Sequence, residues 1–303
     1  MRILLYLRPT SSFHYLEFSN YYFQGFIYKL LRNSEFHWLH QYKGFKMFNF
    51  SNLFPIEKDK IIKQNKIYHI IISSPNKTLI DVIFKNLREY KGKSIKLGNF
   101  EFLLEKAKKY KLKLSFPWKT SSPIILTKNK EVYLSDGKEV YKIVLKTLNH
   151  PLLKLFKKKK IKSNIHLKNA KEISITKLPY LDNKKFKIVR ILDIYYNFEK
   201  GDFQLEEWLR DLKDNSLEKY FSFTGYNFYF EEPLFEEVKF EKPVSIRIKM
   251  KGKDVIFIGS LWKRLNVLRK LDREEKKFYM FLLDVGLGKL NSLGFGFLNP
   301  IKE

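Results

Sequence analysis

The sequence contains no cysteine among its 303 residues, which excludes disulfides, thiolate zinc sites, iron–sulfur clusters and cysteine nucleophiles. Its apolar runs are far shorter than the roughly 20 residues of a membrane-spanning helix, so no membrane partner is expected. The apolar run at 3–7 is flanked by Arg2 and Arg8 and is too short for a secretory signal. These absences predict a cytoplasmic protein.

Acidic residues are also scarce, since 32 Asp and Glu stand against 59 Lys and Arg and give a formal net charge of +27. A field of this size attracts polyanions or anionic membranes. Aromatic residues make up 17% of the chain, and rings beside cationic side chains are typical of surfaces that bind single-stranded nucleic acid. The composition favours a nucleic-acid partner. An A/T-rich genome or life at high temperature would explain much of the lysine, but not the shortage of acid.

The N-terminal part of the chain shows a β-α-β-β-α-β order, which is typical of the ferredoxin-like fold. Its helices are expected from Ser19, a good N-cap, to about Arg32, and over 77–90. Its strands are expected at 2–8, 46–50, 68–73 and as a pair between 94 and 116.

A cluster of Pro, Ser and Thr at 117–123 predicts a domain boundary, after which the pattern restarts. We therefore expect an α+β protein with tandem ferredoxin-like domains, 1–118 and 122–303. The second is expected to carry an acidic helical insertion near 200–223, for which the sequence suggests no function. Its other predicted elements are strands at 123–127, 172–178 and 186–196, a helix over 139–149, a hairpin over 244–258, and a helix that starts with the capping box Asp272 and Glu275.

Two segments stand out as candidate functional sites. Tyr28 lies roughly 140° around the first helix from Phe23, off its apolar stripe, so it is not simply a core residue. The segment 35–48 then brings two histidines, two lysines and several aromatic residues close together. Near the C-terminus, four glycines fall within 286–296, and the backbone of such a loop is able to approach a phosphate closely.

The stretch Gly-x-Gly-x-x-Asn-Ser-x-Gly-Phe-Gly, from Gly286 to Gly296, resembles the glycine-rich signature of the CRISPR-associated repeat-processing endoribonucleases of the repeat-associated mysterious protein superfamily. The stretches at 24–28, 39–40 and 44–51 look like the catalytic region of that family. The resemblance implies two ferredoxin-like domains, in agreement with the pattern above. It also implies that CRISPR repeat RNA is the partner, that proteins of an interference complex are further partners, and that the enzyme is a monomer or homodimer.

The resemblance further implies that Tyr28, His40 and Lys46 form the active site, with His37 as an alternative to His40. In that chemistry the RNA supplies its own 2′-hydroxyl nucleophile, so no metal and no cofactor are expected. Histidine exchanges protons near neutral pH, and Lys46 would stabilise charge on the transition state. The RNA-binding residues implied are Gly286, Gly288, Lys289, Asn291, Ser292, Gly294, Phe295 and Gly296.

Two other readings remain open at this point. A non-catalytic RNA-binding subunit with the same fold would explain the charge and the glycine-rich loop, but would leave the set of Tyr28, His40 and Lys46 as coincidence. A metal-dependent nuclease using His37 and His40 has no third ligand at suitable spacing. The lysine run 157–160 would extend a basic track, although such runs are more often solvated surface.

Overall fold

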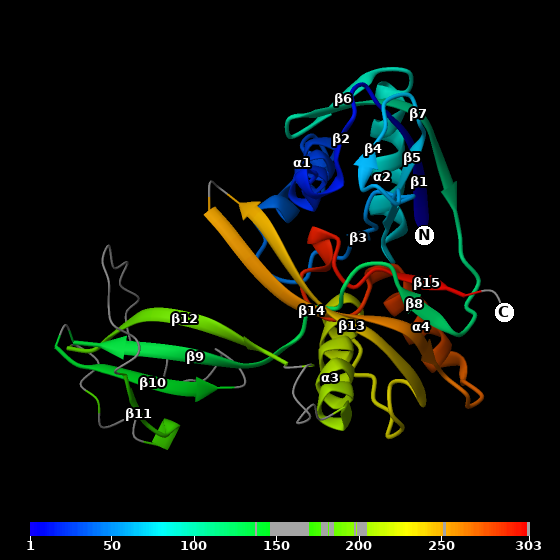
Figure 1. Cartoon of the computed structure of the whole chain (residues 1–303). Helices are drawn as coiled ribbons and strands as arrows, with labels where there is room; N and C mark the ends of the chain where they lie inside the picture. The colour runs from blue at the N-terminus through cyan, green and yellow to red at the C-terminus, as the bar shows by residue number, and fades with distance from the viewer. Residues whose placement is uncertain are drawn as a thin grey trace. The chain divides into compact units, whose positions relative to one another are not determined.

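The computed structural model describes residues 1–136, 138–145, 170–176, 181, 185–196, 198, 205–250 and 253–301. The chain divides into two compact units (Figure 1). The larger unit contains Met1–Ile125 and Gln204–Glu303, and the smaller unit contains Leu126–Phe203.

The first half of the larger unit is an antiparallel sheet with strand order β3-β5-β1-β7-β6. Without the extra edge strand β6, this is the order in which a ferredoxin-like fold arranges its four strands, and the two helices follow the first and third of them. The elements are β1 (Arg2–Pro9), α1 (Asn20–Leu31), β3 (Asn49–Phe50), β5 (Tyr68–Ser73), α2 (Lys77–Leu87), β6 (Ser94–Leu97) and β7 (Phe100–Tyr110), with a small separate pair β2 (Phe13–His14) and β4 (Ile61–Ile62).

Alternation along β1 and helical spacing along α1 produce one shared core. Ile3, Leu5 and Leu7 are fully buried on one face of β1 and pack in the same cluster as Phe23 and Ile27 of α1. The Ser19 side chain accepts a hydrogen bond from the Tyr21 N–H and so caps α1. The expected first helix, its cap and the strand at 68–73 are confirmed.

The second half of the larger unit repeats the same topology. Its sheet has the order β13-β14-β8-β15, and its helices precede β13 and β15. Its elements are β8 (Trp118–Thr120), α3 (Leu205–Thr224), β13 (Glu237–Met250), β14 (Lys253–Asn266), α4 (Arg273–Val285) and β15 (Leu298–Pro300). The predicted capping box is present, because Asp272 and Glu275 each accept a hydrogen bond from the other's backbone N–H.

Helix α3 has a different place from the one expected of an insertion. It lies in the chain where a ferredoxin-like fold has its first helix, and the additional residues are those between β8 and α3. The Trp208 ring stacks on Trp262 of β14, with centroids 4.5 Å apart, and Tyr220 packs against Phe281 of α4. Of the acidic residues that suggested an insertion, Glu206 and Asp214 are exposed, and Glu207 and Asp211 are half-buried at the side of α3.

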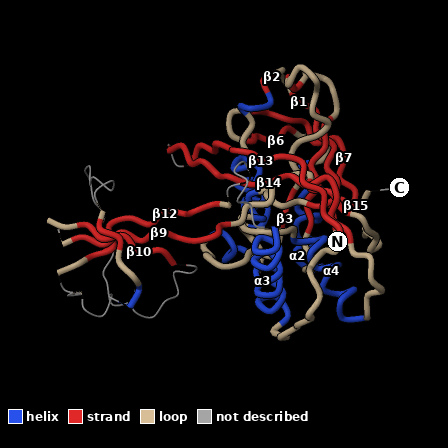
Figure 2. Tube along the Cα trace, turned by 60° about the horizontal axis from the view of Figure 1, so that its bottom comes forward, coloured by secondary structure: helices blue, strands red, loops and turns tan. Residues whose placement is uncertain are grey.

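The smaller unit, as far as it is described, is a four-stranded sheet with one short helical turn at 175–176 (Figure 2). Its core includes Val132, Ile143 and Phe186. The strands are β9 (Thr127–Ser135), β10 (Val140–Leu145), β11 (Lys171–Glu172) and β12 (Lys187–Tyr195), in the order β11-β10-β9-β12.

The helix predicted over 139–149 is wrong where the structure describes it. Val140–Leu145 is β10, which pairs antiparallel with β9. Ile143 and Leu145 are buried while Val144 between them is exposed, which is the period of a strand. Residues 146–149 and the lysine run 157–160 lie outside the described residues. The strand expected at 186–196 is confirmed as β12.

None of the helices in the described ranges combines the length and the apolar composition that a bilayer crossing requires.

A buried arginine connects the two halves of the larger unit. The Arg2 side chain is only 1% exposed, and its guanidinium donates to the carbonyl oxygens of Leu283 and Leu298 and to Asn299 Oδ1 at 2.7–2.9 Å. Asp284 lies 3.9 Å from Arg2 Nε and also accepts from the Met1 amino group. Because buried charges need partners, this cluster fixes β1 against α4 and β15.

We predict that Arg2→Leu destabilises the protein strongly, since it leaves the Asp284 carboxylate and two carbonyl oxygens with fewer donors. The expected loss is about 3–5 kcal/mol, typical of breaking a buried ion pair. Arg8→Leu on the same strand is the control. Its ion pair with Glu105 is partly exposed and should contribute no more than about 1 kcal/mol. Thermal melting of both variants measures the difference, and equal melting temperatures would contradict the assignment.

Candidate active site

The structure brings Tyr28, His40 and Lys46 together. Lys46 Nζ donates to Tyr28 Oη at 2.8 Å and lies 3.3 Å from the carbonyl oxygen of His40. The imidazole of His40 packs edge-on against the Tyr28 ring, with centroids 5.0 Å apart. The three residues come from α1, from the 3-10 helix His37–His40 and from the segment before β3.

Local packing positions these side chains. Leu39, between the two histidines of the short helix, is 1% exposed and belongs to the core under α1. Phe48 is fully buried and contacts the Tyr28 ring edge-on at 6.0 Å. The strand predicted at 46–50 is present only as β3, Asn49–Phe50, so Lys46 lies in an irregular segment whose ends are held by buried Leu39 and Phe48.

His37 is placed differently from His40. Its side chain is exposed, and Nδ1 lies 3.1 Å from the Ser34 carbonyl oxygen within the same turn. The cavity beside Tyr28 and Lys46 is lined by His40 and not by His37. The geometry therefore favours His40 as the histidine of the site.

Burial changes the protonation of two of these groups. Desolvation raises the pKa of Tyr28 to about 12, while the nearby Ser292 side chain opposes the shift. Desolvation also lowers the pKa of Lys46. Tyr28 therefore keeps its proton at neutral pH, and Lys46 is an incompletely hydrated cation whose interaction with an anion is stronger than in bulk water.

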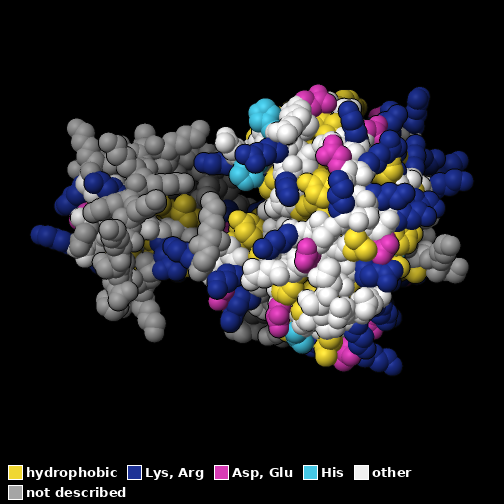
Figure 3. Space-filling view, turned by 90° about the horizontal axis from the view of Figure 1, so that it is seen from above, with side chains coloured by type: hydrophobic (Ala, Val, Ile, Leu, Met, Phe, Trp, Pro, Cys, Tyr) yellow, Lys and Arg dark blue, Asp and Glu magenta, His cyan; other side chains and the backbone are white. Residues whose placement is uncertain are grey.

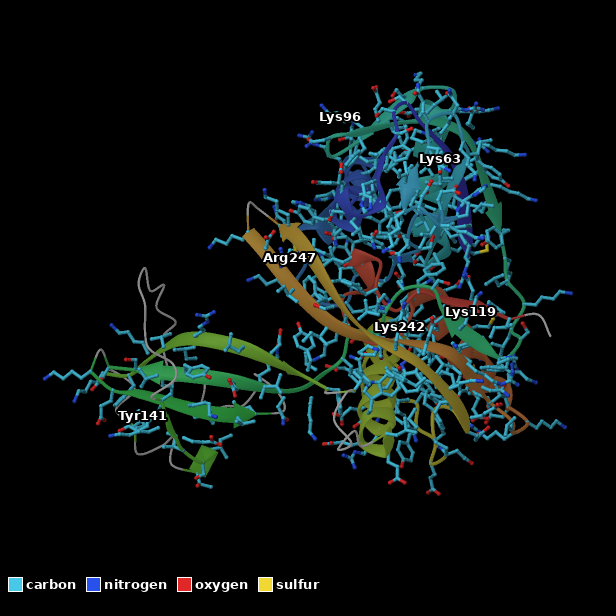
Figure 4. All side chains as sticks on the ribbon, viewed as in Figure 1. Lys63, Lys96, Lys119, Tyr141, Lys242 and Arg247 are labelled. Atoms are coloured by element: carbon cyan, nitrogen blue, oxygen red, sulfur yellow. The ribbon has the colours of Figure 1, made fainter. Side chains whose placement is uncertain are left out.

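A cavity of about 540 Å³ opens along α1, which we name the α1 cavity. Besides Tyr28, His40 and Lys46, its walls include Lys29 of α1 and Lys96 of β6, labelled in Figure 4. On the face shown in Figure 3, Lys and Arg side chains spread over the larger unit and are more numerous than the Asp and Glu side chains among them. The cavity thus combines cationic, aromatic and proton-transferring groups, as a site for a nucleic-acid strand requires.

The glycine-rich loop, residues 286–296, is packed into the protein rather than exposed. A Cβ on Gly288 would lie 2.5 Å from the Ile125 carbonyl oxygen, and one on Gly296 would lie 1.9 Å from that of Leu287. Both glycines have positive φ, which disfavours any other residue. Close packing inside the chain, more than approach to a phosphate, accounts for these glycines.

This burial divides the eight residues expected to bind RNA. Gly286, Gly288, Asn291, Gly294, Phe295 and Gly296 are all buried. Only Lys289 and Ser292 of the expected set are partly accessible, together with exposed Leu290. The loop therefore presents a short 289–292 tip toward solvent on a buried base.

The tip of the loop is bonded to α1. Gln24 Nε2 donates to the Ser292 carbonyl oxygen at 2.8 Å and lies 3.3 Å from Ser292 Oγ. Tyr28 lies one helical turn after Gln24, and the Ser292 side chain is near enough to lower the pKa of its hydroxyl against the effect of burial. This explains why Tyr28 is off the apolar stripe of α1, because it faces the loop as well as the core.

Lys219 of α3 supports the loop from within the protein. Its Nζ donates to the carbonyl oxygens of Gly286 and Gly288 and to Asn291 Oδ1, at 2.7, 3.1 and 3.2 Å. These three acceptors match the three N–H bonds of an ammonium. Complete burial lowers the pKa of Lys219 to about 7. The sequence offered one signal for this residue, a lysine in line with the buried positions of an amphipathic helix.

No group of three or more His, Asp or Glu residues within the described ranges is arranged to hold a metal ion.

Comparison with known proteins identifies the family. A family model described as CRISPR associated protein Cas6, C-terminal, matches residues 193–300. The CRISPR-associated endoribonuclease Cas6 2 of Methanocaldococcus jannaschii is 30% identical over 312 residues, which cover 100% of both chains. The chain belongs to the Cas6 family. The resemblance noted in the sequence is confirmed.

Solved structures agree with the Cas6 fold. One described as CRISPR associated protein Cas6 is 22% identical, with a TM-score of 0.60 over 100% of this chain and 99% of that one. Another, described as an RAMP protein binding different RNA substrates, is 18% identical, with a TM-score of 0.57 over 100% of both chains. A third, the product of a Cas6-related gene from Pyrococcus furiosus, is 19% identical, with a TM-score of 0.56 over 100% of this chain and 99% of that one. They support the predicted tandem ferredoxin-like α+β fold.

We predict that Lys219→Met loosens the glycine-rich loop, because it removes three donors from buried acceptors. Backbone amide exchange over 286–296, corrected for intrinsic rates, should accelerate at least about tenfold. A tenfold change corresponds to a loss of roughly 1.4 kcal/mol in the free energy of local opening, which the loss of hydrogen bonds to buried acceptors should exceed. Lys213→Met is the control on the same helix, since Lys213 donates to the carbonyl oxygens of Glu231 and Glu232 instead. Unchanged exchange in the loop of Lys219→Met would contradict the role of Lys219.

The stability of the protein should also carry a pH signature of Lys219. The pKa is lower in the folded chain, so between about pH 7 and 10.5 the unfolded state binds a proton that the folded state does not. Wild-type stability relative to Lys219→Met should therefore increase as the pH rises through that window, by at most about 1.4 kcal/mol per pH unit. Chemical unfolding at pH 6.5 and pH 9 measures it, and a constant difference would show that Lys219 does not titrate there.

Proposed function

We propose that this chain is an endoribonuclease that binds CRISPR repeat RNA and cuts precursor CRISPR RNA once per repeat. The full-length relative from Methanocaldococcus jannaschii carries an endoribonuclease name, which supports an enzymatic role. The observation that carries the proposal is the contact of Lys46 Nζ with Tyr28 Oη, with the His40 imidazole against the same ring.

Three tasks remain for the protein when the RNA supplies its own nucleophile. A proton must move, the reacting atoms must be aligned, and charge must be stabilised on the pentacoordinate phosphorus. Attack by the 2′-oxygen expels the 5′-oxygen of the next nucleotide. The products are a 2′,3′-cyclic phosphate and a 5′-hydroxyl, and no water or metal ion enters this balance.

Each residue of the site suits one of these tasks. His40 is exposed beside the cavity and transfers the proton, from the 2′-hydroxyl or to the leaving 5′-oxygen. Tyr28, with a pKa of about 12, stays protonated near neutral pH and orients the phosphate or the nucleophile through its hydroxyl. Lys46, partly desolvated, stabilises the negative charge of the transition state.

Binding rests on the surroundings of the three residues. Lys29 and Lys96 line the α1 cavity with Tyr21 and Tyr22, and they offer phosphate neutralisation and stacking surfaces. The accessible part of the glycine-rich loop adds Lys289 and Ser292. In this proposal the loop's buried glycines act through packing, by holding the tip beside α1.

We predict that cleavage of repeat RNA continues in excess EDTA and leaves a 2′,3′-cyclic phosphate and a 5′-hydroxyl. The physical reason is that side chains and the RNA supply every group in the proposed reaction. Mass spectrometry of the product ends provides the measurement, with a substrate carrying a single 2′-deoxy nucleotide at the scissile position as control. Loss of cleavage on chelation would overturn the mechanism. Tight binding without any cleavage would instead favour a non-catalytic RNA-binding subunit.

We predict that His40→Ala lowers the cleavage rate by about two to four orders of magnitude, the range for removing a general acid or base. Binding of the 2′-deoxy substrate should change little. His37→Ala is the matched control, because His37 lies outside the cavity lining. Single-turnover cleavage and filter binding separate the two effects. If His37→Ala were the slow variant, the assignment would move by one helical turn.

A further inference from the structure

A second cavity shares Lys46 with the α1 cavity. It has a volume of about 450 Å³ and lies between the segment 42–46, the glycine-rich loop and one face of α3. We name it the α3 cavity. Lys46 is the residue common to the linings of both cavities as described, so a phosphate bound at Lys46 borders both of them. A strand that places its scissile phosphate there is able to place a neighbouring nucleotide in the α3 cavity.

The walls of the α3 cavity have the chemistry of a nucleobase site. Phe45 and Tyr42 provide aromatic surface, and Tyr42 is 43% exposed. Lys43 and Lys289 provide charge at the side of the loops. A volume of this size is in the range of small-ligand sites, roughly 300–1,000 Å³. Stacking on a ring beside cationic side chains is how proteins hold unpaired bases.

The carboxylate of Glu218 is an acidic group in a cavity that otherwise suits RNA. Glu218 lines the cavity from α3 and is exposed, yet the structure gives it no ion-pair partner within the described ranges. A carboxylate close to an RNA backbone is repelled by phosphate. It becomes favourable when it accepts hydrogen bonds from the N–H groups of a base. Asn215, one turn earlier, also lines the cavity. Its Oδ1 is buried and has no hydrogen-bond partner in the described part of the chain.

We propose that the α3 cavity binds the base of a nucleotide adjacent to the scissile phosphate, and that Glu218 selects a base with an exocyclic amino group over uracil. Cytosine, adenine and guanine present an exocyclic amino donor to a carboxylate. Uracil offers only its ring N3–H, which is flanked by two carbonyl oxygens that repel the carboxylate. This inference rests on the proposed function, because it takes the scissile phosphate to lie at Lys46.

The experiment uses the repeat RNA whose cleavage site the product ends define. Each of the two nucleotides that flank the scissile phosphate is replaced in turn by U, C, A and G, and affinity is measured on 2′-deoxy versions. Wild type should bind uracil at one of the two positions about 5- to 100-fold more weakly than the preferred amino-bearing base, the range for one good base-specific contact. Glu218→Gln should reduce that preference to less than about threefold, because the amide also donates to uracil oxygens.

The matched control is Asp214→Asn, which makes the same change of charge on the same helix at a residue outside the cavity lining. It should keep the wild-type preference. If both variants lose the base preference, the preference depends on net charge and the proposal is overturned. The proposal is also overturned if Glu218→Gln keeps the preference, or if wild type shows no preference at either position. Failure of wild type to cut any repeat RNA would instead reject the proposed function.

Discussion

The buried amino group of Lys219 is the constraint on which the candidate site depends. A polar group removed from water needs hydrogen-bond partners, and here they are two carbonyl oxygens and one amide oxygen of the glycine-rich loop. Turning those oxygens toward α3 sets the path of the loop's backbone. The opposite side of the loop then meets α1, where Gln24 donates a hydrogen bond to the Ser292 carbonyl oxygen. Helices from both halves therefore position one short segment.

Local signals predicted much of the fold. Ser19 and Asp272 cap α1 and α4 as their sequences indicate, and the apolar run at 68–73 is β5. Their determinants lie within one or two turns of the residues concerned, so the sequence alone contains them. Val140–Leu145 was mistaken for a helix because its apolar pattern is short, and pairing with β9 decides its conformation.

The candidate site was predictable only in part. Tyr28, His40 and Lys46 were identified through family resemblance, and their contacts agree with a common site. Lys219 and Gly286, which are 67 residues apart in the chain, carry no local signal of their contact. The acidic residues of α3 suggested a separate insertion because charged residues are evident in the sequence, whereas the sequence does not identify the residues against which the buried face of the helix packs. Trp208 and Tyr220 on the buried face assign α3 to the second sheet and to α4.

The burial of the glycines changes what their motif can be used for. The positions that make the motif recognisable are those where a Cβ would collide with the protein's own backbone, as at Gly288 and Gly296. Such a motif records how two sheets and their helices are joined. A protein that had lost its histidine and lysine would keep the same glycines for the same steric reason. Within this architecture, the motif distinguishes members of the fold from other proteins, and it does not separate those that cut RNA from those that only hold it.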